Sequence, residues 1–230
     1  MIMAKRRRGT KMPDYTEGDI AAKIKRIYKA FNLEKLAEYD CKSRNVDDMM
    51  AAVPRYSGLI VLFEEIDGKK RIVFIGYSEN VHRRVRQYFY DIERNATLKR
   101  HIGYAMLNRD NYDVEILQLW WDYQNRRRLA NVDYMQIERT YVANVLAYIR
   151  ENISFKLVRT DTAGEAADMA WRILATLSRD KTFSSGTWLG IHSPHSQVRE
   201  SGLWAMRTHR SRTVMKENEF QQLEEWLDRM

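Results

Sequence analysis

Residues 58–63 read Gly-Leu-Ile-Val-Leu-Phe, and residues 71–76 read Arg-Ile-Val-Phe-Ile-Gly. Both runs are apolar and rich in β-branched side chains, which is typical of buried strands. Between them, the pair Asp67-Gly68 marks a tight turn, because Gly adopts the positive φ angles that hairpin turns need. We therefore expect the two runs to pair as a β-hairpin at the centre of the fold.

The period of the pattern changes directly after this hairpin. Ser78 or Asn80 can cap a helix that begins there. The apolar face of that helix consists of Val81, Val85 and either Tyr88 or Phe89. Three arginines occupy its flanks, namely Arg83, Arg84 and Arg86. The sequence therefore predicts a β-hairpin that leads directly into a basic helix.

The hairpin and the basic helix resemble the GIY-YIG nuclease superfamily in spacing as well as in residue type. In that family, Gly-Ile-Tyr lies on one strand and Tyr-Ile-Gly on the next. An Arg follows on a helix, with a His or Tyr one turn later. Here residues 58–60 and 74–76 stand for the two triplets. The other matching positions are Ser78, Asn80, Arg84, Tyr88, Glu138 and Asn152. The resemblance covers about residues 55–155.

The resemblance implies an endonuclease that hydrolyses DNA and depends on Mg²⁺ or Mn²⁺. Glu138 would hold the metal ion, and Arg84 would bind the scissile phosphate, because a bidentate guanidinium suits the phosphate oxygens. Further contacts with the nucleic acid are expected from Asn80, Arg83, Arg86 and Asn152. Such an enzyme would be of the restriction or mobile-element type.

Both signature tyrosines of the family are replaced in this chain, by Ile60 and Phe74. In the family, the first of these tyrosines is thought to deprotonate the attacking water. Tyr88 is our preferred substitute, because the family accepts a His or Tyr at that position. The other candidates are Tyr77, His82 and Tyr56.

Glu138 also stands out without the resemblance. The expected helix 132–150 presents an apolar stripe of Met135, Val142, Leu146 and Ile149. Glu138 lies on the same side of this helix, which is an expensive position for a carboxylate unless a cation or hydrogen bonds hold it. We therefore expect Glu138 to face either a metal site or a structural salt bridge, for example with Arg84.

The fold class predicted from the whole chain is α+β. A small, mostly antiparallel three-stranded sheet is flanked by helices, with helical extensions at both ends. Residues 1–14 are expected to be a flexible basic arm, 15–54 a helical extension, 55–158 the nuclease-like domain and 159–230 a second extension. Two short helices are expected within residues 17–40. Strands beyond the hairpin are expected at 112–121 and 154–158, and further helices at 97–107, 132–150, 162–177 and 216–230.

The C-terminal extension has an unusual composition at residues 182–207, where Gly and Ser alternate with Trp188 and Trp204. This pattern is typical of base-edge or backbone recognition in nucleic-acid-binding proteins. The alternative, which we favour for the two Trp side chains, is that they pack on the domain. Phosphate contacts are expected from Arg199, Arg207 and Arg210. His192 and His195 alone are a weak indication of a metal.

The charge of the chain favours an anionic partner. It has 39 Lys and Arg against 31 Asp and Glu among 230 residues, which gives a formal net charge of +8. The single Cys41 excludes an internal disulfide and suits a reducing compartment. No apolar run approaches 18 residues, the length typical of a membrane span. We expect a cytoplasmic or nucleoid-associated protein that binds DNA, with RNA as the alternative and no membrane.

Three functions remain open at this point. The first is the metal-dependent DNA endonuclease, which would be a homodimer if it cuts both strands of a symmetric site. The second is a nucleic-acid-binding protein on the same scaffold that has lost cleavage along with the tyrosines. The third is an assembly protein that binds a protein partner through its Trp-rich C-terminus. Joint retention of Arg84, Tyr88, Glu138 and Asn152 favours the first.

Overall fold

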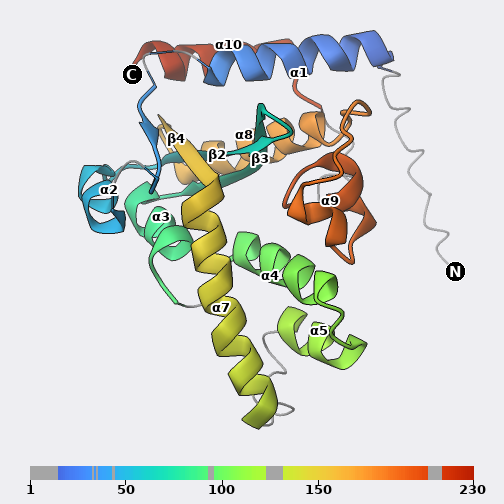
Figure 1. The fold of residues 1–230 in the computed structure, drawn as a ribbon. Coiled ribbons are helices and arrows are strands. Elements are labelled where there is room, and N and C mark those ends of the chain that lie inside the picture. Colours follow the sequence, from blue (N-terminus) through green and yellow to red (C-terminus); the bar gives the residue numbers. More distant parts are fainter. Residues whose placement is uncertain are drawn as a thin grey trace, which may run out of the picture.

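The computed structural model describes residues 15–32, 34, 36–42, 45–92, 96–122, 132–206 and 214–230. The expected basic arm at residues 1–14 lies outside the described residues, as do Arg207 and Arg210. The architecture of the described part is α+β, with a mainly antiparallel sheet enclosed by helices (Figure 1).

The expected hairpin forms the core of the sheet. Strands β2 (Gly58–Ile66) and β3 (Lys69–Ser78) pair antiparallel. They are joined by a turn in which Asp67 has φ 51° and Gly68 has φ 69°, as a type I′ turn requires. The register shifts between Leu62 and Phe63, whose partners are Phe74 and Ile72, so Val73 is the extra residue of a β-bulge.

The sheet has four strands rather than the expected three. Strand β4 (Ile153–Arg159) pairs antiparallel with β2, close to where a last strand was predicted. Strand β1 (Glu38–Tyr39) pairs with β4, and the Tyr39 ring stacks on that of Phe155 at 5.1 Å. This pairing replaces the second of the two helices expected within residues 17–40. The strand order is β1-β4-β2-β3, so β3 is at an edge.

Helices cover both faces of the sheet (Figure 1). On one side lie α3 (Val81–Phe89), α4 (Thr97–Arg109) and α7 (Val132–Asn152), and on the other lies α8 (Ala163–Leu177). Helix α7 runs away from the sheet, with its C-terminal end nearest to it. The shorter helices are α2 (Val46–Ala52), η1 (Leu189–His192) and α9 (Ser196–Ser201).

The first and last helices of the described chain lie side by side (Figure 1). Helix α1 (Glu17–Phe31) packs along α10 (Glu217–Asp228). Arg26 of α1 forms ion pairs of 2.8 Å with both Glu217 and Glu224 of α10, and its guanidinium also lies 4.4 Å from the centre of the Phe220 ring. The last helix therefore packs on its own chain.

The prediction of a strand at residues 112–121 is wrong, because this segment contains helix α5 (Val114–Trp121). The side chain of Asp113 caps the helix by accepting a hydrogen bond from the backbone N–H of Ile116, at 3.0 Å. Leu117 and Trp120 are buried three residues apart, whereas Val114 is 63% exposed. Alternating apolar residues had suggested a strand, but the buried positions follow the helical period.

The Trp-rich segment after α8 belongs to the core. Trp188 and Trp204 are buried, and their indole N–H groups donate to the carboxylate of Glu64 at 3.1 and 3.4 Å. The backbone N–H of Trp204 donates to the carbonyl of Val73, the bulge residue, at 2.7 Å. Packing on the domain, rather than exposure for recognition, is therefore confirmed for both indoles. They are not available to a protein partner.

Helix α7 matches its prediction in extent but not in its whole apolar stripe. Val142, Leu146 and Ile149 are buried as expected, whereas Met135 is 47% exposed. Glu138 is buried on the apolar side, as expected. None of the helices in the described ranges combines the length and the apolar character that a membrane crossing requires.

Candidate functional site

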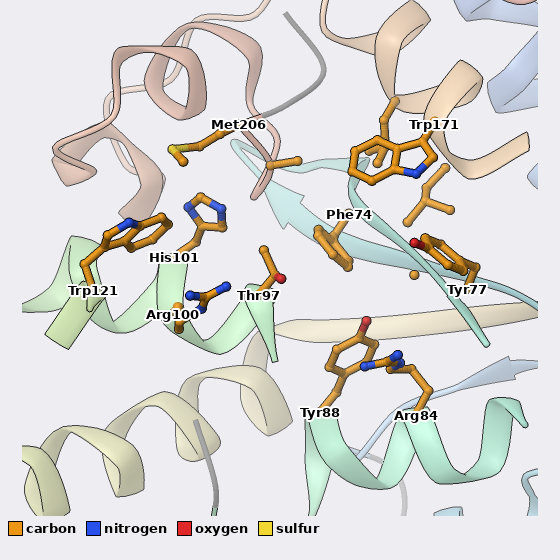
Figure 2. A pocket seen from close by; sticks show the side chains of 14 residues that line it. Phe74, Tyr77, Arg84, Tyr88, Thr97, Arg100, His101, Trp121, Trp171 and Met206 are labelled. Carbon is orange, nitrogen blue, oxygen red and sulfur yellow. The ribbon is translucent and has the colours of Figure 1, made fainter. Parts of the chain in front are cut away.

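A cavity of about 510 Å³ lies at the edge strand β3, next to the point where Trp204 is anchored. Its walls come from β3, from α3 and α4, from Trp121 at the end of α5, from α8 and from the segment after α9. The lining residues are Phe74, Ile75, Gly76, Tyr77, Arg84, Tyr88, Thr97, Arg100, His101, Trp121, Trp171, Leu174, Ala205 and Met206. Figure 2 shows these side chains converging from elements distant in sequence.

Helix α3 places Arg84 and Tyr88 in this cavity together. The helix begins where the Asn80 side chain accepts a hydrogen bond from the backbone N–H of Arg83, at 3.1 Å. Arg84 and Tyr88 are four residues apart and therefore lie on the same side of the helix. The end of the second hairpin strand, residues 74–77, and the basic helix therefore line the same cavity.

Gly76 allows Tyr88 to approach the sheet. A Cβ atom at position 76 would lie 2.7 Å from the Tyr88 hydroxyl, closer than real Cβ atoms come to other atoms. The Tyr88 ring also meets the edge of the Phe74 ring, with centroids 6.1 Å apart. Phe74 and Gly76 therefore form the surface on which Tyr88 packs, although Phe74 carries no hydroxyl.

Arg84 supplies a positive charge to the cavity. The residue is half-buried, and its guanidinium donates to the side-chain oxygen of Gln87 at 2.9 Å. Its side-chain partner in the described part of the chain is thus Gln87 rather than Glu138. None of the described lining residues is Asp or Glu. A cation in a partly dehydrated cavity without acids favours an anionic ligand.

Tyr88 is not suited to the role of general base. Burial raises the pKa of Tyr88 to about 12. Its phenol therefore remains protonated at neutral pH, where a base must be free to accept a proton. The hydroxyl is instead suited to donate a hydrogen bond to a ligand oxygen. Tyr77, which follows Gly76 on β3, also lines the cavity.

Helix α4 adds residues that the sequence did not single out. Thr97 lies one turn before the consecutive residues Arg100 and His101 on α4, and all three line the cavity. The Arg100 guanidinium lies 5.3 Å from the centre of the Trp121 ring. Burial, with His195 and Arg100 nearby, lowers the pKa of His101 to about 3. The helical spacing of Thr97, Arg100 and His101 was visible in the sequence, but not the surface that they face.

Glu138 does not line this cavity. It lies in the second turn of α7, while Asn152 is the last residue of the same helix. About four turns separate them, or about 20 Å at 1.5 Å per residue. Asn152 donates to the carbonyl of Tyr148 at 2.9 Å and borders a different hollow, together with Glu64 and Arg109. The structure therefore does not bring Glu138 and Asn152 together in one site.

The other expected contact residues also lie away from the cavity. His82 and Arg86 border a third hollow beside α2, and Arg86 pairs with Asp91 at 3.0 Å. Arg83 is exposed, and the oxygen of Asn80 is used as the helix cap. Arg199 is exposed and donates to the carbonyl of Ser193. These side chains are placed outside the Arg84 cavity.

The described lining residues do not fit a magnesium ion. Mg²⁺ prefers carboxylate and other oxygen ligands, whereas this cavity offers two guanidiniums, one imidazole and three hydroxyl groups among its described polar side chains. Nowhere among the described residues do three His, Cys, Asp or Glu side chains gather as a metal site would need. We therefore assign no metal-dependent step to these residues.

Comparison with protein families identifies a matching family. A sequence model of the GIY-YIG domain matches residues 79–229, which is more than half of the chain. The match includes α3 with Arg84 and Tyr88, and it extends through the Trp-rich segment to the last helix. Neither the curated proteins nor the solved structures contain a significant match.

Proposed function

Because the chain belongs to the GIY-YIG family, a nuclease-type family, we propose that it binds DNA at the Arg84 cavity and hydrolyses a phosphodiester bond there as an endonuclease. The observation that carries the proposal is that the half-buried Arg84 lines a cavity whose described lining contains no acid. Phosphoryl transfer depends mainly on positioning and on charge stabilisation, which such a guanidinium provides.

Two side chains of α3 have defined roles in this proposal. Arg84 binds the non-bridging oxygens of the phosphate through two N–H groups, which fixes the orientation of the phosphate. Tyr88, whose phenol stays protonated because of its raised pKa, donates a hydrogen bond to the same phosphate. Both interactions strengthen as negative charge develops on the phosphate oxygens during the attack of water.

A second candidate function is DNA binding without cleavage. Two observations favour it. Neither position of the signature tyrosines carries a hydroxyl, because the residues there are Ile60 and Phe74. Ile60 is fully buried, and the ring of Phe74 packs on Tyr88. In addition, Tyr88, our preferred substitute base, is protonated at neutral pH. In this case Arg84 would anchor a phosphate, and binding would weaken steeply with salt because counterions are released on association.

The experiment that separates these functions uses supercoiled plasmid with the intact protein, in parallel reactions containing Mg²⁺, Mn²⁺ or a chelator. We expect nicking by the wild type and a loss of about 10³–10⁵ in rate for Arg84→Ala. Arg83→Ala is the matched control, because this neighbouring arginine is exposed and does not line the cavity. Equal activity of both variants would contradict the role of Arg84.

The same reactions test the metal and the substrate. Glu138→Ala tests the Mg²⁺ or Mn²⁺ dependence that the family resemblance implies: loss of cleavage in this variant would support Glu138 as the residue that holds the metal ion, and unchanged cleavage would contradict it. An RNA of the same sequence tests the choice of DNA. If no cleavage occurs but a salt-sensitive gel shift is lost in Arg84→Ala, the second candidate function is correct. Sedimentation of the free and DNA-bound protein tests the homodimer expected of an enzyme that cuts both strands of a symmetric site.

A further inference from the structure

We propose that the Arg84 cavity receives one unpaired nucleotide, with its base stacked on tryptophan, so that the protein acts on nucleic acid containing unpaired bases. This inference rests on the proposed function for the identity of the ligand as a nucleic acid. It adds the state of the substrate, namely unpaired rather than fully duplex.

The tryptophans of the chain divide into two groups. Of its six Trp residues, four are buried: Trp120, Trp188, Trp204 and Trp226. The other two, Trp121 and Trp171, are half-buried, and both line the cavity. Packing accounts for the four buried indoles but not for the partial exposure of the other two at one site. Aromatic rings, the indole among them, are common stacking surfaces for unpaired bases.

The two half-buried indoles differ in their freedom to stack. Trp121 is held by neighbouring rings, with centroids 4.5 Å from His195, 5.1 Å from His101 and 5.3 Å from Tyr104. Trp171 has no ring contact of this kind within the described part of the chain. In the view of Figure 2, Trp171 and Tyr77 lie at one end of the cavity and Trp121 at the other. Trp171 is therefore the better stacking surface.

The charges of the cavity fit the backbone of the same nucleotide. In Figure 2, Arg84 and Arg100 lie along the lower side of the cavity, below Trp171 and Trp121. With no Asp or Glu among the described lining residues, a phosphate at Arg84 meets no repulsion from the wall. A nucleotide, which combines a flat aromatic group with a phosphate, therefore matches both parts of the lining.

The shape of the site selects against a fully paired base. The cavity measures about 510 Å³, within the range of about 300–1,000 Å³ typical of small-ligand pockets. A base inside a duplex has both faces stacked on its neighbours and cannot present one to an indole. Entry therefore requires that the base leave the stack, which costs least where it is already unpaired.

The test is a binding measurement by fluorescence anisotropy with labelled oligonucleotides of one sequence. The probes are a single strand, the full duplex and a duplex with an unpaired flap, each as DNA and as RNA. We expect the single strand and the flap to bind more tightly than the duplex. Trp171→Ala should weaken binding of the unpaired probes about tenfold or more, and leave binding of the duplex unchanged.

Two further variants complete the design. Trp171→Phe retains an aromatic ring and should recover most of the binding, which separates lost stacking from a folding defect. Tyr90→Ala is the matched control, because this exposed aromatic side chain borders a different hollow. The nucleic acid, DNA or RNA, that shows the larger loss in Trp171→Ala is the natural ligand.

The outcomes for the two proposals are separable. Equal binding of the duplex and unpaired probes, or equal losses in Trp171→Ala and Tyr90→Ala, would overturn the unpaired-base inference even if plasmid cleavage is observed. Tighter binding of unpaired probes that depends on Trp171, without cleavage of any probe, would support the inference while the proposed hydrolysis fails. Cleavage next to the unpaired bases that is lost in Trp171→Ala would support both.

Discussion

Arg84 and Tyr88 show how much of the candidate site depends on single positions. Their spacing on α3 places both on one side of the helix, and Gly76 leaves room for the Tyr88 hydroxyl above β3. A side chain at position 76 would fill the space that the hydroxyl occupies. The site is therefore sensitive to a single added methyl group at position 76, although that group is uncharged and unreactive.

Gly76→Ala should destabilise the protein by about 1–3 kcal/mol and displace Tyr88, because its Cβ would lie 2.7 Å from the Tyr88 hydroxyl. Urea unfolding, followed by circular dichroism, measures the change in the free energy of unfolding. Gly186→Ala is the control, because a Cβ there meets nothing within 4 Å. Equal stability of the two variants would show that Tyr88 does not depend on Gly76.

His101→Phe should make the protein more resistant to acid. The pKa of His101 is lowered from an ordinary 6.5 to about 3 by burial, His195 and Arg100. The stability that depends on neutral His101 is therefore present above pH 6.5 and is lost as the pH falls towards 3. Phe has no such proton to bind, so its acid-unfolding midpoint, measured by circular dichroism, should shift to lower pH. An unchanged midpoint would contradict this.

At the scale of elements, one carboxylate joins three segments. Glu64 of β2 is buried and accepts hydrogen bonds from the hydroxyl of Tyr148 on α7 and from the indoles of Trp188 and Trp204. Tyr148 precedes α8 in the sequence, whereas Trp188 and Trp204 follow it. Glu64 therefore connects the segment after α8 to the hairpin and to α7. This contact also holds the segment that ends at Met206, a wall of the cavity.

Glu64→Ala should destabilise the protein by about 3 kcal/mol or more, because it leaves three donors without their acceptor, two of them buried indoles. It should also increase proteolysis within residues 183–206. Glu65→Ala is the matched control, since Glu65 is the next residue on β2 and its side chain is exposed. Urea unfolding and limited proteolysis provide the two measurements. Equal behaviour of both variants would mean that Glu64 does not hold this segment.

At the scale of the whole molecule, the residues after β4 complete the core. Helix α8 covers one face of the sheet with buried Met169, Ala170, Ile173, Leu174 and Leu177. Helix α10 packs on α1, with Phe220, Leu223, Trp226 and Leu227 buried. The nuclease-like segment at residues 55–158 therefore shares its core with the segments on both sides of it.

A fragment of residues 55–158 should not fold cooperatively. Each fully buried large apolar side chain that α8 contributes is worth about 1.5–3 kcal/mol, and the total stability of a domain is about 5–15 kcal/mol. The free energy lost on removal of α8 alone is thus comparable to the whole free energy of unfolding of a domain. A broad, non-cooperative thermal transition by circular dichroism is expected, in contrast to the intact chain. A sharp transition in the fragment would contradict this.

Local patterns were sufficient for much of the fold. Asp67-Gly68 predicted the hairpin turn, and the helical periodicity predicted α4, α7, α8 and α10. The cap of α3 was expected at Ser78 or Asn80, and it is Asn80. Local patterns failed at residues 112–121, where alternating apolar residues suggested a strand but Asp113 starts a helix. The two-residue strand β1 was also missed, since it depends on a partner far along the chain.

For the site, the sequence by itself determined that Arg84 and Tyr88 lie together on a helix next to the second hairpin strand. This follows from the helical repeat and from chain connectivity, which are local properties. Only the tertiary structure decided that Arg100, His101, Trp121 and Trp171 join them and that Glu138 and Asn152 do not. The reason is that helix packing, which no short stretch of sequence encodes, sets which distant side chains face one cavity.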